Sequence, residues 1–369
     1  MVAVSKQNNT VELYDEVYNL NELKEEKDLL SPNLINIQDG KEVENKRLYT
    51  YWSGFINGKH VFIMKDENGD IEFLSIMNDF HVNSFTKHSS SGEASFLSKL
   101  ESDDEDMVDL SNDYVTTDDT ESYPLNMTRH AYLPSNISSF YEDTSIFSYY
   151  SRCTYYRRID VAIAYDSSFC SLYGGHNKAA KKVLNIVSLA SNRYRQQGLC
   201  LKLRVSALEG HCDVNTDPYV QMRHQQSGCA GYDALLQVNF VYTFSDFSSH
   251  IFPKDFTSYW HYNRKQIPRD AAHLFVGKQF QDAKIGCAGI GTLCRGAYAV
   301  ESMSSKDINF QSLLFAHELG HNCGAYHTSD PSTIMYPFIA DGSDGFSAGT
   351  TSAMLNYLNH QKCLKKVAS

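Results

Sequence analysis

The 369-residue sequence has no cysteine in its first 152 positions, and all nine of its cysteines follow. Such clustering favours an oxidised, secreted setting over the cytosol. The odd count leaves at least one thiol unpaired or paired outside the chain. The cysteines are Cys153, Cys170, Cys200, Cys212, Cys229, Cys287, Cys294, Cys323 and Cys363.

Long apolar runs are also lacking. Met1–Thr10 has no apolar stretch typical of a signal peptide, and no later segment is long enough to span a bilayer. Asn-X-Ser/Thr sequons at Asn8, Asn126 and Asn136 agree with export. We therefore expect a secreted glycoprotein, without a membrane span, whose leader is not visible in this chain.

Basic residues are absent between Glu101 and Glu121, where aspartates and glutamates are frequent. This pattern predicts an acidic, flexible linker over residues 96–150 and favours it over an acidic interaction segment. The net charge of −11 gives no reason to expect nucleic acid as a partner.

Residues 1–95 alternate polar and apolar stretches with turn residues between them. Apolar, β-branched and aromatic residues gather in 47–54, 60–64 and 71–76, and Asn68-Gly69 is a hairpin signal. The segment is predicted to be a β-rich domain of short antiparallel strands.

Residues 151–369 have the pattern of an α/β (α+β) domain with a mostly parallel, twisted sheet. A strand at 159–165, a helix at 177–197 and a strand at 199–205 form a parallel unit. A helix at 233–247 is expected to follow, then a strand at 271–277 in which His273 is a core histidine. Later elements are a helix capped by Asp307 or Ser305 and a closing helix at 350–360.

A cluster of histidines in Leu313–His327 is the strongest chemical signal. His317 and His321 are four residues apart and face the same side of a helix. Gly324 permits a positive-φ turn that brings His327 to the same ion. Three imidazoles with one open position are typical of catalytic zinc. Glu318 is displaced around the helix and suits a general base acting on water at the metal.

These residues, together with Met335 in the segment Ser332–Pro337, resemble the metzincin zinc endopeptidases. The 159–205 unit and the cysteine ending at Cys363 resemble the adamalysin or reprolysin branch. The resemblance implies a secreted zinc endopeptidase, with Met335 as a hydrophobic floor below the metal and a small C-terminal subdomain. It also implies that residues 1–95 are a reprolysin-type propeptide and 151–369 the protease domain.

Further expectations follow from the resemblance alone. The glycine-rich Gly286–Gly291 is expected to be the cleft's edge strand, which binds an extended peptide substrate. Tyr336 and Pro337 are expected to wall the specificity pocket, Cys294 is expected to bridge to Cys363, and a structural calcium ion is allowed for. The residues expected at the strand are Gly286, Ala288, Gly289 and Ile290.

Some features depart from the reprolysin pattern. Thr328 stands where an aspartate is usual, and Cys323 where leucine is common. The lack of cysteine before Cys153 excludes cysteine-switch latency. Two alternatives therefore stay open: a catalytically silent binding or adhesion module, and a zymogen in which residues 1–150 permanently cover the cleft.

Overall fold

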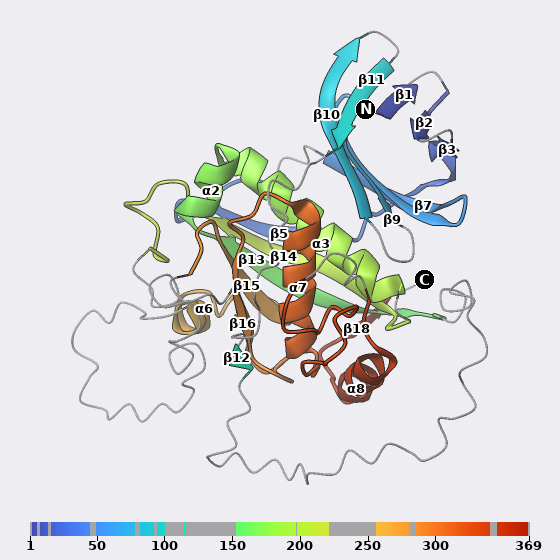
Figure 1. Ribbon diagram of the computed structural model, residues 1–369. Helices are drawn as coiled ribbons and strands as arrows, with labels where there is room; N and C mark the ends of the chain where they lie inside the picture. Colours follow the sequence, from blue (N-terminus) through green and yellow to red (C-terminus); the bar gives the residue numbers. More distant parts are fainter. Residues whose placement is uncertain are drawn as a thin grey trace, which may run out of the picture.

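The computed structural model describes residues 2–99 with gaps at 6–7, 14–15, 45–48, 78–81 and 92–93. It also describes residues 114–115, 153–220 except 197, 256–280, 285–339 and 345–367. These residues form two sheets and five α-helices (Figure 1). The helix predicted at 233–247 and the sequons at Asn126 and Asn136 lie outside the described residues.

The first sheet is antiparallel and belongs to the N-terminal region. Its predicted hairpin turn forms where expected: Gly69 has φ +80, and the Asp66 carboxylate accepts hydrogen bonds from the backbone N–H groups of Asn68 and Asp70, both at 2.9 Å. The order is β3 (Glu16–Asn19), β2 (Thr10–Leu13), β1 (Val2–Ser5), β11 (Ala94–Lys99), β10 (Val82–Ser91), β9 (Ile71–Met77), β8 (Lys59–Asp66), β7 (Tyr49–Ile56) and β4 (Lys24–Glu25). The prediction of short antiparallel strands here is confirmed.

The second sheet is mixed and mostly parallel, as expected for the C-terminal region. Its order is β12 (Tyr114–Val115), β16 (Gly286–Ala288), β17 (Ala297–Ser302), β15 (Ala271–Val276), β13 (Tyr156–Tyr165), β14 (Leu201–Gly210), β5 (Leu30–Gln38) and β6 (Lys41–Glu42), with β18 (Lys365–Val367) paired to β13. Strand β13 runs parallel to both β14 and β15, while β16 runs antiparallel to β17. The predicted fold class is confirmed.

Alternation along β13 separates two layers of core. Ile159, Val161 and Ile163 pack on the face covered by α3 (His176–Gln196) and α7 (Ile308–Asn322), whereas Ala162 and Ala164 pack with α6 (Phe256–Asn263). Helix α3 confirms the prediction at 177–197, since its apolar stripe is fully buried. Two further helices are α2 (Ser167–Tyr173) and α8 (Ala348–Asn359), the latter at the predicted closing position.

Three strands do not follow the predicted division of the chain into an N-terminal β-rich domain, a linker and a protease domain. Strands β5 and β6 come from the N-terminal region but belong to the second sheet, where β5 lies parallel to β14. Strand β12 comes from the segment expected to be a linker and pairs in parallel with β16. Two segments that precede the C-terminal region thus contribute strands to the two ends of its sheet.

Candidate metal centre

The histidine-bearing helix α7 is capped by Asp307, whose side chain accepts a hydrogen bond from the Asn309 N–H at 2.7 Å. This is one of the two predicted caps, and it satisfies a backbone donor that the first turn would otherwise leave unpaired. The helix is buried along most of its length, including His317, Glu318 and His321. Burial on every side fixes these side chains rather than leaving them to sample solvent.

The three predicted histidines converge. Nε2 of His321 lies 3.0 Å from Nε2 of His317, which lies 3.1 Å from Nε2 of His327. The ligand atoms of all three lie within 4.8 Å of one another. His327 reaches the helix because Gly324, with φ +89, reverses the chain, and the Ala325 N–H then donates to the Gly320 carbonyl at 2.9 Å.

The hydrogen bonds of the His317 and His321 rings indicate which kind of ligand the three histidines can bind. Nδ1 of His317 lies 2.6 Å from the Ile334 carbonyl oxygen, and Nδ1 of His321 lies 2.9 Å from that of Ala325. A carbonyl oxygen only accepts, so each Nδ1 carries a proton and each Nε2 of the neutral ring is an acceptor. Two acceptors cannot hydrogen-bond to each other, so their approach fits a shared cation.

The spacing agrees with zinc. Nitrogen ligands about 2.0–2.1 Å from a tetrahedral Zn²⁺ lie about 3.3 Å apart, close to the separations of these rings. Backbone carbonyls on the outer ring nitrogens are also the partners that orient metal-binding imidazoles. The residues present therefore fit a zinc ion bound by His317, His321 and His327.

The side chain of Glu318, on helix α7, lies against Gly286 of strand β16. A Cβ added to Gly286 would lie 1.9 Å from the Glu318 Oε1 atom and 2.7 Å from its Cδ. The carboxylate is completely buried. From the sequence, Gly286 was expected to allow the close approach of a substrate backbone. The structure shows that Gly286 also leaves room for the Glu318 carboxylate.

Met335 is fully buried beneath helix α7: a Cβ on Gly320 would meet its sulfur at 2.7 Å. Its carbonyl accepts a hydrogen bond from the Thr328 N–H at 2.8 Å, and the hydroxyls of Thr328 and Thr333 are 2.6 Å apart. Thr328 therefore ties the segment after His327 to the Met335 turn. The sequence showed Thr328 only as a departure from a pattern and gave no sign of this contact.

The residues expected to bind substrate lie near the helix but are not equally exposed. Gly286, Ala288 and Gly289 are buried, whereas Ile290, Tyr336 and Pro337 are half-buried. The strand itself ends at Ala288. The Gly289 carbonyl accepts from the Asn322 side chain at 2.9 Å, and the Gly291 N–H donates to the His321 carbonyl at 2.9 Å. These bonds join the end of the strand directly to the end of α7.

Strand β16 is already paired on its outer side. Tyr114 and Val115 of β12 lie in register with Cys287 and Ala288. The edge that was expected to be open to an extended peptide is therefore covered at these two positions by the protein's own chain.

Three disulfides occur among the described residues: Cys153–Cys200, Cys170–Cys212 and Cys294–Cys363. The last is the pair that the resemblance implies, and Cys287 is also disulfide-bonded. Cys323 is the free cysteine of the described chain; it is buried, and burial raises the pKa of its thiol well above the usual range. Its thiol is thus protonated and inert.

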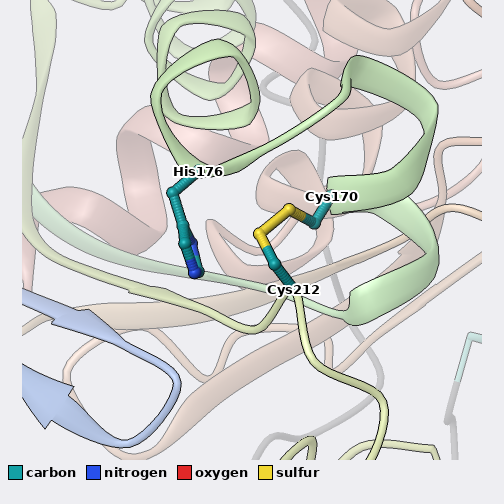
Figure 2. Close-up of side chains that lie close together, drawn as sticks. All are labelled: Cys170, His176 and Cys212. Carbon is teal, nitrogen blue, oxygen red and sulfur yellow. A yellow bond between two sulfur atoms is a disulfide. The ribbon is translucent and has the colours of Figure 1, made fainter.

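Two other groups of potential metal ligands in the described residues have different explanations. Asp270 lies beside the Cys294–Cys363 disulfide, and His176 lies beside the Cys170–Cys212 disulfide (Figure 2). Disulfide sulfurs are not the thiolates that bind zinc. Neither group offers the oxygen-rich ligand set that calcium prefers, so the expected calcium ion gains no support from the described part of the chain.

His273 is buried and pairs through Nδ1 with Glu301 at 2.5 Å, which confirms that it is a core histidine outside the metal cluster. Within the described residues no helix is both long and apolar enough to cross a membrane.

The arrangement defines a metallopeptidase-type centre: a buried helix with two histidines, a third histidine after a glycine turn, and a methionine turn below. A family model described as metallo-peptidase family M12, of the reprolysin type, matches residues 155–363. The chain belongs to this family, which confirms the resemblance.

Individual relatives match over smaller parts. The disintegrin and metalloproteinase domain-containing protein 1 of Rattus norvegicus is 32% identical over an alignment of 106 residues, and the match covers 26% of this chain and 13% of that protein. The chain thus spans only a small part of that relative's length. A solved structure titled "Structure of a chaperone-substrate complex" has 16% identity and a TM-score of 0.38, and the match covers 56% of this chain and 34% of that one.

Proposed function

We propose that this protein is a secreted, zinc-dependent endopeptidase that hydrolyses peptide bonds in protein substrates. The convergence of the three histidine Nε2 atoms, with protons held on the opposite nitrogens by carbonyl groups, carries the proposal. Membership of a metallopeptidase family supports the same reaction class. His317, His321 and His327 would hold the metal.

A bound zinc ion would supply a Lewis acid that polarises the peptide carbonyl and makes water acidic enough to attack near neutral pH. The protein's part is to hold and move the proton. Glu318 accepts it from the attacking water and delivers it to the departing amine. Its buried position against Gly286 places this carboxylate beside the strand along which we propose that a peptide substrate lies in extended form.

Substrate would be bound by the β16 end of the sheet. Gly286, Ala288, Gly289 and Ile290 are proposed to contact the peptide backbone, and Tyr336 and Pro337 the side chain beside the cleaved bond. Met335 supports the metal site from below without binding the ion.

Secretion is proposed from the cysteine chemistry. Disulfides of this number persist in oxidising compartments and not in the cytosol. The Asn8 sequon is exposed, so it is accessible to glycosylation. We propose that residues 1–95 are the protein's own propeptide and that this propeptide binds the protease region.

The decisive experiment compares the full chain with its Glu318→Gln variant on a peptide library read by mass spectrometry, with and without a chelator. We expect cleavage that the chelator abolishes. We expect Glu318→Gln to retain one zinc per chain by metal analysis but to lose roughly 10²–10⁴-fold in kcat. Full activity in that variant would contradict the assignment of Glu318.

The same assay tests the silent binding module. That alternative predicts zinc binding without cleavage in every form of the protein, including forms in which β12 can no longer pair with β16.

A further inference from the structure

Strand β5 extends the C-terminal sheet on the side away from β16, and β6 follows it at the edge. It pairs in parallel with β14, from Leu30 opposite Val205 to Gln38 opposite Gly210, with an irregularity between. Backbone hydrogen bonds continue at both ends, from the Val205 N–H to the Leu29 carbonyl and from the Asp39 N–H to the Gly210 carbonyl, both at 2.9 Å. Without β5, the N–H and C=O groups of this β14 edge would lose their partners.

A charged contact fixes the strand at its start. The guanidinium of Arg195, on α3, binds the two Glu26 carboxylate oxygens at 2.7 and 3.0 Å. Both side chains are mostly shielded from water. Burial alone would raise the pKa of Glu26, but the charge and hydrogen bonds of Arg195 and a hydrogen bond from Ser53 outweigh it and lower that pKa to about 2. Such bidentate pairs are among the stronger ionic contacts in proteins.

A second contact fixes the strand at its end. Oδ2 of Asp39 lies 2.8 Å from Nε2 of His176, the residue beside the Cys170–Cys212 disulfide in Figure 2. The other oxygen, Oδ1, accepts hydrogen bonds from the backbone N–H groups of Cys212 and Asp213 at 2.8 and 3.2 Å. One carboxylate from the N-terminal region therefore joins the start of α3 to the loop after β14.

The two regions also share one apolar core. Side chains of β7, β8 and β9 belong to the same buried cluster as those of α3 and α7. The N-terminal members are Leu29, Tyr51, Phe62, Met64, Phe73 and Met77. Separation of the two regions would expose this apolar face to water, at a cost that grows with its area.

Although the shared core includes α7, the β5 attachment is on the opposite side of the second sheet from β16, the strand beside the histidine-bearing helix. Strands β14, β13, β15 and β17 stand between β5 and β16. We propose that residues 2–99 are a permanent, non-covalently held subunit of the metalloprotease region, which stays bound after the connecting chain is cut and leaves the histidine centre able to work. The activity part rests on the proposed function; the association part does not.

The test uses the full chain with the recognition sequence of a site-specific protease inserted between residues 120 and 150. Because all nine cysteines follow residue 152, no disulfide can join the two pieces after cutting. Size-exclusion chromatography in 0.15 M and 1 M NaCl then reports non-covalent association alone. We expect the cut protein to elute with the uncut chain and to separate into two pieces only in denaturant. Elution as two native species, or precipitation of the C-terminal piece alone, would overturn the proposal.

Charge variants test which contacts hold the pieces together. The cut Glu26→Gln, Asp39→Asn double variant is expected to dissociate at least tenfold more readily than the cut parent. Glu42→Gln is the matched control, because Glu42 lies on β6 but is exposed. Equal dissociation of the double variant and the control would contradict the role of these carboxylates.

Peptide cleavage by the cut complex separates this inference from the proposed function. Retained association with chelator-sensitive cleavage supports both. Retained association without cleavage in any form rejects the enzyme proposal and leaves the subunit intact. Cleavage only after the N-terminal piece has been removed would contradict the claim that it leaves the histidine centre able to work.

Discussion

Gly286 and Glu318 lie so close that only a residue without a side chain fits at position 286. A Cβ there would also approach the Leu314 Cδ1 atom at 3.0 Å, so the carboxylate and the helix both limit the space. The close approach couples two parts of the proposed mechanism, since the strand that would bind substrate also sets the position of the base.

Gly286→Ala is accordingly expected to displace the Glu318 carboxylate and to lower kcat by at least about tenfold, because small misplacements of a reacting group are costly. Zinc content and thermal stability should change much less than kcat. Gly349→Ala is the matched control, since the nearest atom to its Cβ would be 3.9 Å away. Steady-state kinetics with metal analysis would contradict the idea if Gly286→Ala were as active as the control.

The histidines could be predicted from sequence because the helical spacing alone determines which face they share, and the turn at Gly324 needs a residue that tolerates positive φ. The contact of Thr328 with Met335 could not, because it joins two irregular segments by a backbone hydrogen bond that any residue except proline could make. A pattern of residue types does not record such bonds.

At the scale of elements, helix α3 and strand β5 show why prediction succeeded in one case and failed in the other. Helix α3 has a buried apolar stripe with a helical period, which a sequence displays directly. In β5 only Ile37 is buried, and Pro32, which has no backbone N–H, lies within the strand. A strand with so little buried surface has no alternating pattern, and its partner β14 is far away in the chain. The sequence around β5 therefore gave no indication that this strand belongs to the second sheet.

Strand β12 gives an element-scale prediction about latency, which depends on the proposed function. Its pairing with Cys287 and Ala288 occupies the edge where substrate is proposed to add. Replacing both Tyr114 and Val115 by proline removes their N–H donors. The double proline variant is expected to raise kcat/KM for a short quenched peptide several-fold.

The double alanine variant of Tyr114 and Val115 is the control, because alanine keeps both backbone donors while removing the side chains. If the proline and alanine variants have equal activity, backbone pairing by β12 does not restrain the enzyme.

At the scale of the whole molecule, the junction between the two regions contains a buried histidine. His60, on β8, is only 5% exposed. Burial, together with the charge of Arg195 and against the opposing charge of Glu26, lowers the pKa of His60 from 6.5 to about 3. The folded protein therefore keeps this ring neutral at pH values where the unfolded chain protonates it.

The sign of the pH dependence follows from that difference. Between pH 6.5 and 3 the unfolded state binds the extra proton, so the stability contributed by His60 is present above pH 6.5 and is lost as the pH falls. At pH 5 the loss amounts to about 2 kcal/mol. The lowered pKa values of Glu26 and Asp39, both about 2, affect stability only below their unfolded values near 4.5 and 3.8, so they add little at pH 5.

Thermal unfolding at pH 7.5 and pH 5 isolates this contribution. Between pH 7.5 and pH 5, the unfolding midpoint of the parent chain is expected to fall by roughly 2–4 °C more than that of His60→Gln, because glutamine does not titrate. His261→Gln should behave like the parent, because His261 is exposed on α6. Apart from the replaced histidine, the three proteins share the same titratable groups, so the effect of those groups cancels in the comparison. If His60→Gln and the parent lose the same number of degrees, the junction histidine does not set the acid sensitivity of the molecule.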